Sequence, residues 1–216
     1  MKGLLIKDIM LMKEQKNFFL LFIAVSLGTL IFSEDVSFTL GFFPFVISLF
    51  TLSTISIDEF DNGCAFLFTL PVTRRDYVRE KYGLGLMLGL GALVFSVLLC
   101  LGACLRGSAA MLDVFSAALA LLPALLIILA VMIPFQLKFG GEKGRLALIG
   151  ALALLALLVA GLVKLAALLG LDLEAVLLSL TSLGVWSLLA LLLAVSVAAL
   201  LLSMKISVSI MEKKEF

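Results

Sequence analysis

The sequence contains no histidine and only three cysteines, Cys64, Cys100 and Cys104. Because zinc sites in proteins are built mainly from histidine and cysteine, the chain lacks the ligands of a zinc hydrolase. Cys100 and Cys104 lie four residues apart on one helical face, which suits packing better than a disulfide. An intramembrane protease would need polar partners in mid-membrane, and we find none. We therefore expect that the chain is not an enzyme.

Charged residues are also scarce, at 14% of the chain against 63% hydrophobic residues, and the mean hydropathy is +1.28. A soluble globule usually carries about 25% charged residues. The composition therefore excludes that class and indicates an integral membrane protein. At about 20 apolar residues a span, a chain of this length has room for about six transmembrane helices. We predict an all-α membrane protein with one transmembrane domain over residues 1–216.

Six apolar blocks are separated by charge, by glycine or by both. We expect membrane helices at residues 18–32, 36–57, 83–105, 114–137, 146–169 and 184–204. The first block is short enough to be part of a signal peptide, but no A-x-A-like cleavage site follows it near Ser33. We therefore expect it to be a membrane helix as well.

The positive charges are distributed unevenly between the connections. Of the 16 lysines and arginines, 14 fall at the two ends and in alternate connections, whereas only Arg106 and Lys164 fall on the opposite side. Because positive loops stay in the cytoplasm, this bias predicts that both termini are cytoplasmic.

Two short segments lie outside these blocks. Residues 1–16 should form an amphipathic helix in the membrane interface. The alternative is an ordinary basic leader that only sets the topology. Its apolar face would consist of Leu4, Leu5, Ile9 and Met12. Residues 171–183 are too short to cross the membrane and form either a re-entrant or surface helix or merely the ends of two spans.

Four glycines open the third block: Gly83, Gly85, Gly89 and Gly91. Glycines four residues apart allow the backbones of two membrane helices to approach closely. The pair Gly85 and Gly89 has this spacing, which is also common by chance in such sequences. We expect it to permit close helix packing.

The longest polar segment, residues 58–82, connects the second and third blocks on the cytoplasmic side. Residues 64–70 are apolar and long enough for two helical turns, which Pro71 should end. Thr73 is a suitable N-cap, and Asp76 three residues later completes a capping box. A second helix should therefore begin near Arg74 and run unbroken into the third block.

Part of this segment suits the membrane surface. Cationic side chains favour anionic headgroups, and tyrosines favour the interfacial belt. We expect four interfacial anchors here: Tyr77, Arg79, Lys81 and Tyr82. The membrane does not explain Asp58, Glu59 and Asp61, because carboxylates at the end of a helix oppose its negative dipole end.

Apolar side chains in the same connection are equally unexpected: Phe60, Phe66, Leu67, Phe68 and Leu70. An apolar knob flanked by charge is typical of a surface that fits a groove on a soluble partner. The alternative is that these side chains lie in the membrane interface.

The residues of this segment resemble a known family. The motifs are Asp58-Glu59 with Asn62-Gly63, then TLPVTRR over residues 69–75, then Tyr77-Val78 and Lys81-Tyr82. They are similar to the short-permease branch of type-2 ATP-binding-cassette transporters, which includes exporters of phenol-soluble modulins and antimicrobial peptides. The six-span layout agrees with that branch along the whole chain, whereas the motifs themselves cover only residues 58–82.

The resemblance implies a permease in the bacterial plasma membrane that dimerises with itself or with a sibling. It also implies that residues 58–82 form a coupling helix seated on a separate ATPase subunit, which would bind the ATP and magnesium. The partner contacts would come from Asp58, Glu59, Asp61, Gly63, Phe66, Leu67, Leu70, Pro71, Thr73, Arg74 and Arg75. The cargo of similar exporters is an amphipathic or hydrophobic peptide.

The chain itself supports the need for a partner, because it contains no G-x-x-x-x-G-K-[ST] phosphate-binding loop. No nucleic-acid partner is indicated, and the chain should bind no cofactor directly. The alternative function is a non-pumping sensor or immunity subunit that binds an amphipathic peptide. A secondary carrier is disfavoured because the blocks lack charges at mid-membrane.

Overall fold

The computed structural model describes residues 2–32, 36–60, 63–104, 111–140 and 184–214. The elements in these ranges are α-helices, as predicted from composition. They are α1 (Lys2–Glu14), α2 (Lys16–Phe32), α3 (Val36–Glu59), α4 (Gly63–Leu67), α5 (Arg74–Cys104), α6 (Met111–Phe139) and α9 (Val185–Lys213).

Four of these helices, α3, α5, α6 and α9, are long and apolar enough to cross a membrane. The pair α1 and α2 is bent by 65° at a short break and forms a fifth candidate if it is counted as one span. The predicted block at 146–169 and the segment 171–183 lie outside the described residues. The count of six therefore stays a prediction.

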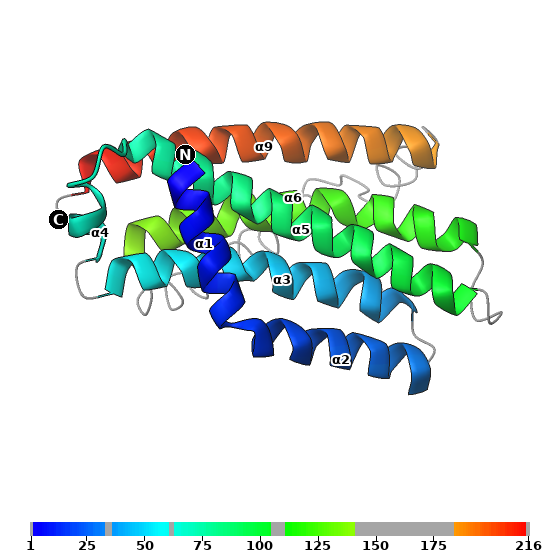
Figure 1. Cartoon of the computed structure of the whole chain (residues 1–216). Helices are drawn as coiled ribbons and strands as arrows, with labels where there is room; N and C mark the ends of the chain where they lie inside the picture. The colour runs from blue at the N-terminus through cyan, green and yellow to red at the C-terminus, as the bar shows by residue number, and fades with distance from the viewer. Residues whose placement is uncertain (1, 33–35, 61–62, 105–110, 141–183, 215–216) are drawn as a thin grey trace, which may run out of the picture.

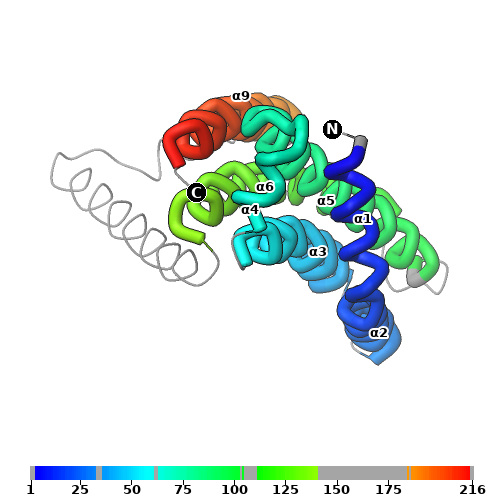
Figure 2. Tube along the Cα trace, turned by 60° about the vertical axis from the view of Figure 1, so that its left-hand side comes forward, coloured from blue at the N-terminus to red at the C-terminus, as the bar shows by residue number. Residues whose placement is uncertain are grey.

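The long helices lie side by side, with α3 against α5 and α6, and α9 against α6 and α5 (Figure 1). Helix α2 flanks α3 (Figure 2), and α1 crosses in front of α3 and α5 in the view of Figure 1. The last turns of α3, α6 and α9 lie at the same end of the bundle as α4 and the first turns of α5 (Figure 1). We call this end the α4 end.

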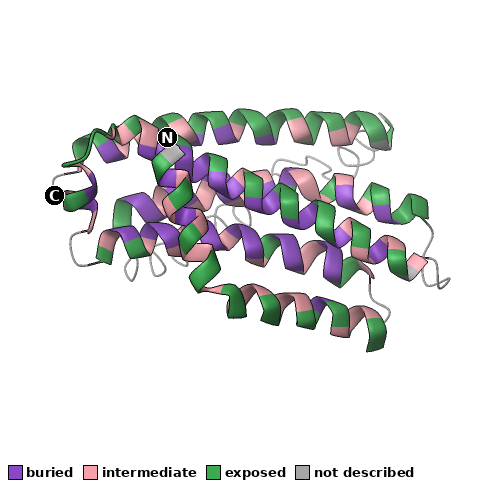
Figure 3. Ribbon diagram, viewed as in Figure 1, coloured by how far each residue is buried: buried purple, intermediate pink, exposed green. Residues whose placement is uncertain are grey.

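Burial differs between the helices. Residues buried inside the protein alternate with exposed ones along α3 and α5, whereas exposed residues line the outer side of α9 (Figure 3). An apolar helix with one face outward suits a lipid environment. Helix α9 therefore contributes a large apolar surface to the outside of the bundle.

Helices α5 and α6 approach closely at two glycines. A Cβ atom added at Gly85 would lie 2.9 Å from Leu129 Cδ2, and one added at Gly89 would lie 2.8 Å from Leu125 Cδ2. Real Cβ contacts are longer than this, so leucine side chains of α6 occupy the space that a larger residue would need. The close packing predicted from the glycine spacing is confirmed.

Substituting a glycine should destabilise the protein on the side of α5 that faces α6 but not on the exposed side. We expect Gly89→Leu to lower the free energy of unfolding by about 2 kcal/mol, because the new side chain overpacks the contact with α6. Gly91→Leu is the matched control, since Gly91 is exposed and an added Cβ meets nothing within 4 Å. Thermal unfolding in detergent measures both. Equal melting temperatures for the two variants would contradict the packing described here.

The structure corrects the predicted surface of the N-terminal helix. The face expected in the lipid is turned toward the protein, with Leu4 buried, while Ile6 and Met10 are exposed. The reason is Asp8, which lies one turn after Leu4 on the same face and is completely buried. A carboxylate at this position needs a cationic partner inside the protein, and α1 therefore packs across α5.

Candidate functional site

The segment from Asp58 to Tyr82 comprises the end of α3, the short helix α4 and the first turns of α5. Helix α4 forms where apolar turns were predicted but ends at Leu67, and the backbone N–H of Leu70 then bonds back to the Leu67 carbonyl at 3.3 Å. Because Pro71 has no N–H to continue the helical pattern, the chain turns at this point.

The predicted helix cap is present at the start of α5. Thr73 Oγ1 accepts a hydrogen bond from the Asp76 backbone N–H at 3.1 Å and donates one to Asp76 Oδ2 at 2.7 Å. Helix α5 begins at Arg74 and continues without a break to Cys104. The corner at Pro71 is thus joined directly to a membrane-crossing helix.

A buried ionic cluster lies immediately beneath this corner. The ammonium of Lys81, which is fully buried, lies 2.5 Å from Asp8 Oδ2 and 2.9 Å from Asp58 Oδ2. Asp58 also accepts hydrogen bonds from the Lys7 ammonium and, at 3.1 Å, from the Tyr77 hydroxyl. These five residues, here called the ionic cluster, join α1, α3 and α5. Each buried charge in it has a partner of opposite sign, as burial requires.

Two further buried groups adjoin the ionic cluster. Lys81 donates a hydrogen bond to Thr54 Oγ1 at 3.1 Å, and the Glu80 carboxylate lies 3.8 Å from the Lys81 ammonium. Both side chains come from helices that already contribute to the cluster. Lys81 is therefore surrounded by oxygen atoms from three helices.

The ionic cluster corrects the predicted interfacial anchors. Tyr77 and Lys81 are buried in it, and Tyr82 is buried against α9, where its hydroxyl hydrogen-bonds to Ser203 at 2.6 Å and Ser207 at 2.8 Å. These side chains find polar partners on other helices, so they do not reach the headgroups. Only Arg79, which is exposed, has the accessibility expected of an anchor.

A second set of contacts fastens the start of α5 to the end of α9. The Arg74 guanidinium donates to the backbone carbonyls of Met211 at 2.9 Å and Glu212 at 2.7 Å. Arg75 Nε lies 2.8 Å from Glu212 Oε1. The last carbonyls of a helix have no partner within it, and a cation is favoured there. These contacts connect the start of α5 directly to the last turn of α9.

Glu59 ties the end of α3 to the neighbouring helix ends. Its carboxylate lies 2.6 Å from the Lys214 ammonium, which also donates to the Leu137 carbonyl at 3.0 Å. Gly140 follows α6 with a φ of 77°, and a Cβ there would lie 3.0 Å from Glu59 Oε2. The acidic residues at the end of α3 thus have partners inside the protein.

The residues predicted to contact a partner separate into three groups. Asp58 and Leu67 are buried, and Glu59, Gly63 and Arg74 are partly buried. The exposed residues are Phe66, Leu70, Pro71, Thr73 and Arg75. Asp61 lies outside the described residues. The prediction that Asp58 and Leu67 are partner contacts is wrong, because Asp58 faces Lys81 and Leu67 belongs to the apolar core.

Exposed apolar side chains remain at the tip of the segment. Phe60 and Phe66 are each 72% exposed and Leu70 is 49% exposed. We call these three residues the tip surface. Phe68, in contrast, packs edge to face against the Tyr77 ring at a centroid distance of 5.8 Å. The predicted apolar knob therefore has one side in the core and one side outward.

Several residues of this site were not anticipated. Asp8, Lys7 and Lys214 carry its ion pairs, and Ser203 and Ser207 hold Tyr82. Asp8 had a signal in the sequence, because it lies one turn after Leu4 on the apolar face of a predicted amphipathic helix. The serines of α9 had none, since serine is common in membrane helices.

The described part of the chain contains no group of three or more histidine, cysteine or acidic residues placed to hold a metal ion. The thiol of Cys64 is buried, and burial together with the carboxylates of Glu59 and Asp58 raises its pKa to about 11. This thiol stays protonated near neutral pH and is a poor nucleophile.

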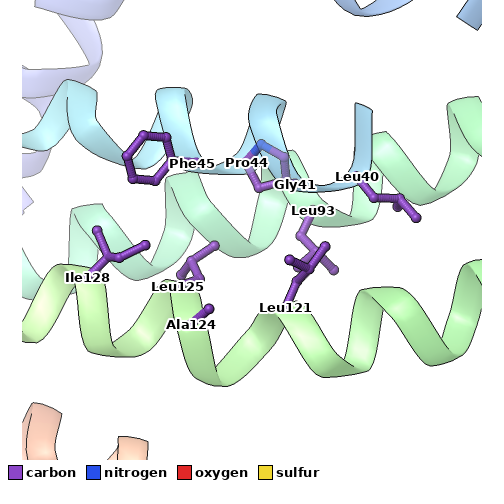
Figure 4. A pocket seen from close by; sticks show the side chains of 9 residues that line it. All are labelled: Leu40, Gly41, Pro44, Phe45, Leu93, Leu121, Ala124, Leu125 and Ile128. Atoms are coloured by element: carbon purple, nitrogen blue, oxygen red, sulfur yellow. The ribbon is translucent and has the colours of Figure 1, made fainter. Parts of the chain in front are cut away.

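One cavity of about 160 Å³ lies between α3, α5 and α6 (Figure 4). Its lining is apolar, with Leu40 and Pro44 from α3, Leu93 from α5, and Leu121 and Leu125 from α6. A cavity of this size and lining offers no polar group to orient a ligand. It does not compete with the α4 end as a functional site.

A family model described as ABC-2 family transporter protein matches residues 3–212. No curated protein and no solved structure matches the chain. The matched range begins in α1 and ends in the last turn of α9. It therefore includes the ionic cluster, the tip surface and the contacts between α5 and α9.

Proposed function

The chain belongs to the ABC-2 family of transporter proteins, and we propose that its segment 58–82 receives the movement of the ATP-binding subunit. As a member of this family it is a multi-pass membrane protein and the transmembrane subunit of an ABC transporter, which works with an ATP-binding subunit. Our proposal adds how the two are joined: the tip surface seats on that subunit, and α5 transmits the movement.

The observation that carries the proposal is the exposure of the tip surface on a fixed support. Phe60, Phe66 and Leu70 expose apolar side chains, and such residues are typical of a partner contact. The corner beside them is held by Arg74 at the end of α9 and by Lys81 in the ionic cluster. A push on the tip would thus reach α1, α3, α5 and α9 together.

The proposal extends to the orientation of the chain in the membrane and to its assembly. We place the α4 end in the cytoplasm of a bacterial cell, because the lysines and arginines of the sequence concentrate on that side. A complete translocation path would need a second permease copy, identical or related. ATP and magnesium would bind in the partner subunit, and this chain would supply no catalytic residue.

The cargo we propose is an amphipathic or hydrophobic peptide. The resemblance to exporters of such peptides is one support. The scarcity of charge along the spans is another, since transport of small polar or ionic solutes usually relies on charged or polar groups within the membrane. An amphipathic peptide could move along apolar helix faces without them.

Purification from the native membrane in mild detergent tests the proposal. We expect a P-loop ATPase in stoichiometric amount in the purified complex, identified by mass spectrometry, and ATP hydrolysis by that complex that rises with an amphipathic peptide. A known ABC transporter carried through the same steps is the control. Recovery of the chain alone, under conditions that keep the control intact, would favour the sensor or immunity function instead.

A further inference from the structure

A groove runs between α6 and α9 toward the α4 end. Its deeper part, of about 440 Å³, has apolar walls that include Pro134 and Phe135 on α6 and Leu202 and Ile206 on α9. Its outer part, of about 480 Å³, shares Lys138, Ile206 and Ile210 with the first. The two parts therefore form one continuous groove.

The outer part of the groove is cationic. Lys138, Lys213 and Lys214 line it together with Ser209. Lys214 is neutralised by Glu59 at 2.6 Å, and nearby Glu212 is paired with Arg75. Lys138 and Lys213 are exposed, so the described residues at the mouth of the groove carry a net positive charge from these two lysines.

We infer that this groove binds an anionic phospholipid, with an acyl chain along the apolar walls and the phosphate at Lys138 and Lys213. The charge at the mouth complements a phosphate, and each lysine near an anionic lipid surface strengthens binding about fivefold. With the orientation proposed above, the site faces the inner leaflet. Lipid binding itself does not depend on the proposed transport function.

The walls favour a hydrocarbon chain over an extended peptide. Ser203, a polar residue in the deeper part, already bonds to the Ala130 carbonyl and to the Tyr82 hydroxyl. The Ala130 carbonyl, which Pro134 leaves without a helical N–H four residues later, accepts this bond from Ser203. An extended peptide would leave its own N–H and C=O groups unpaired here, whereas an acyl chain has none.

Native mass spectrometry of the detergent-purified chain, titrated with phosphatidylglycerol or phosphatidylcholine, tests the inference. We expect phosphatidylglycerol to bind at least about tenfold more tightly than phosphatidylcholine. The double variant Lys138→Gln with Lys213→Gln should bind the two lipids equally. Lys205→Gln is the matched control, since Lys205 is exposed on α9 but does not line the groove. The melting temperature shows whether each variant is folded, and its rise with phosphatidylglycerol gives a second measure.

Equal binding of the two lipids by the unaltered protein would overturn the inference. So would an unchanged preference in the double variant, or an equal loss in Lys205→Gln. The inference would also be overturned if an anionic amphipathic peptide displaced bound phosphatidylglycerol at a concentration below that at which the lipid binds. The groove would then be a cargo site. None of these outcomes bears on whether an ATPase co-purifies.

Discussion

Replacing Lys81 with methionine is expected to lower the free energy of unfolding by about 3 kcal/mol, the largest loss of stability from any single change described here. The substitution keeps the volume of the side chain but removes the cation that lies 2.5 Å from Asp8 and 2.9 Å from Asp58. Both carboxylates are buried, and Lys7 alone would remain to balance them. Transport should fall with the loss of folded protein.

Thermal unfolding in detergent, followed by size-exclusion chromatography, measures this effect. Arg79→Met is the control, because Arg79 lies on the same helix two residues earlier and is exposed. Combining Lys81→Met with Asp8→Asn should recover part of the loss, since one uncompensated charge disappears. A Lys81→Met protein as stable as Arg79→Met, or a double variant with simply additive losses, would show that the ionic cluster does not hold these helices together.

Replacing both Phe66 and Leu70 by aspartate is expected to weaken association with the ATP-binding subunit by at least about a hundredfold. Large apolar side chains at the centre of an interface commonly contribute 2 kcal/mol or more each, and two carboxylates would have to be buried in their place. Co-purification from the membrane measures the loss. The permease itself should insert and melt as before, because both side chains are exposed.

The control for this pair is Thr69→Asp, which adds a carboxylate to the same turn without removing an apolar side chain. Its side chain is exposed and bonds only locally, to the Phe66 carbonyl at 2.7 Å. Leu67 is unsuitable for the test, since it is buried and an aspartate there would disturb the core. If the variant with aspartate at positions 66 and 70 still co-purified with the ATPase, the contact would lie elsewhere on the α4 end. If Thr69→Asp weakened the association equally, the added negative charge, and not the lost apolar contact, would explain the effect.

Much of the segment 58–82 could be predicted from the sequence because its structure is local. The turn before Pro71 follows from the missing N–H of that residue, and the start of α5 follows from a bond between Thr73 and Asp76 three residues apart. The direction of the side chains could not be predicted in the same way. The sequence is equally compatible with Tyr82 as an interfacial anchor and as a buried hydrogen-bonding residue. Only the tertiary structure shows that Ser203 lies beside its hydroxyl.

The sequence by itself determined the class of this protein, the four membrane-crossing helices α3, α5, α6 and α9, and the unbroken start of α5 at Arg74, because composition and short-range capping fix these features. The tertiary structure alone decided that Lys81 and Asp58 face inward. Lys81 pairs with Asp58 and also with Asp8, which lies 73 residues away along the chain. A charge can be buried only where another helix brings the opposite charge within a few ångströms. No periodicity along one segment contains that information.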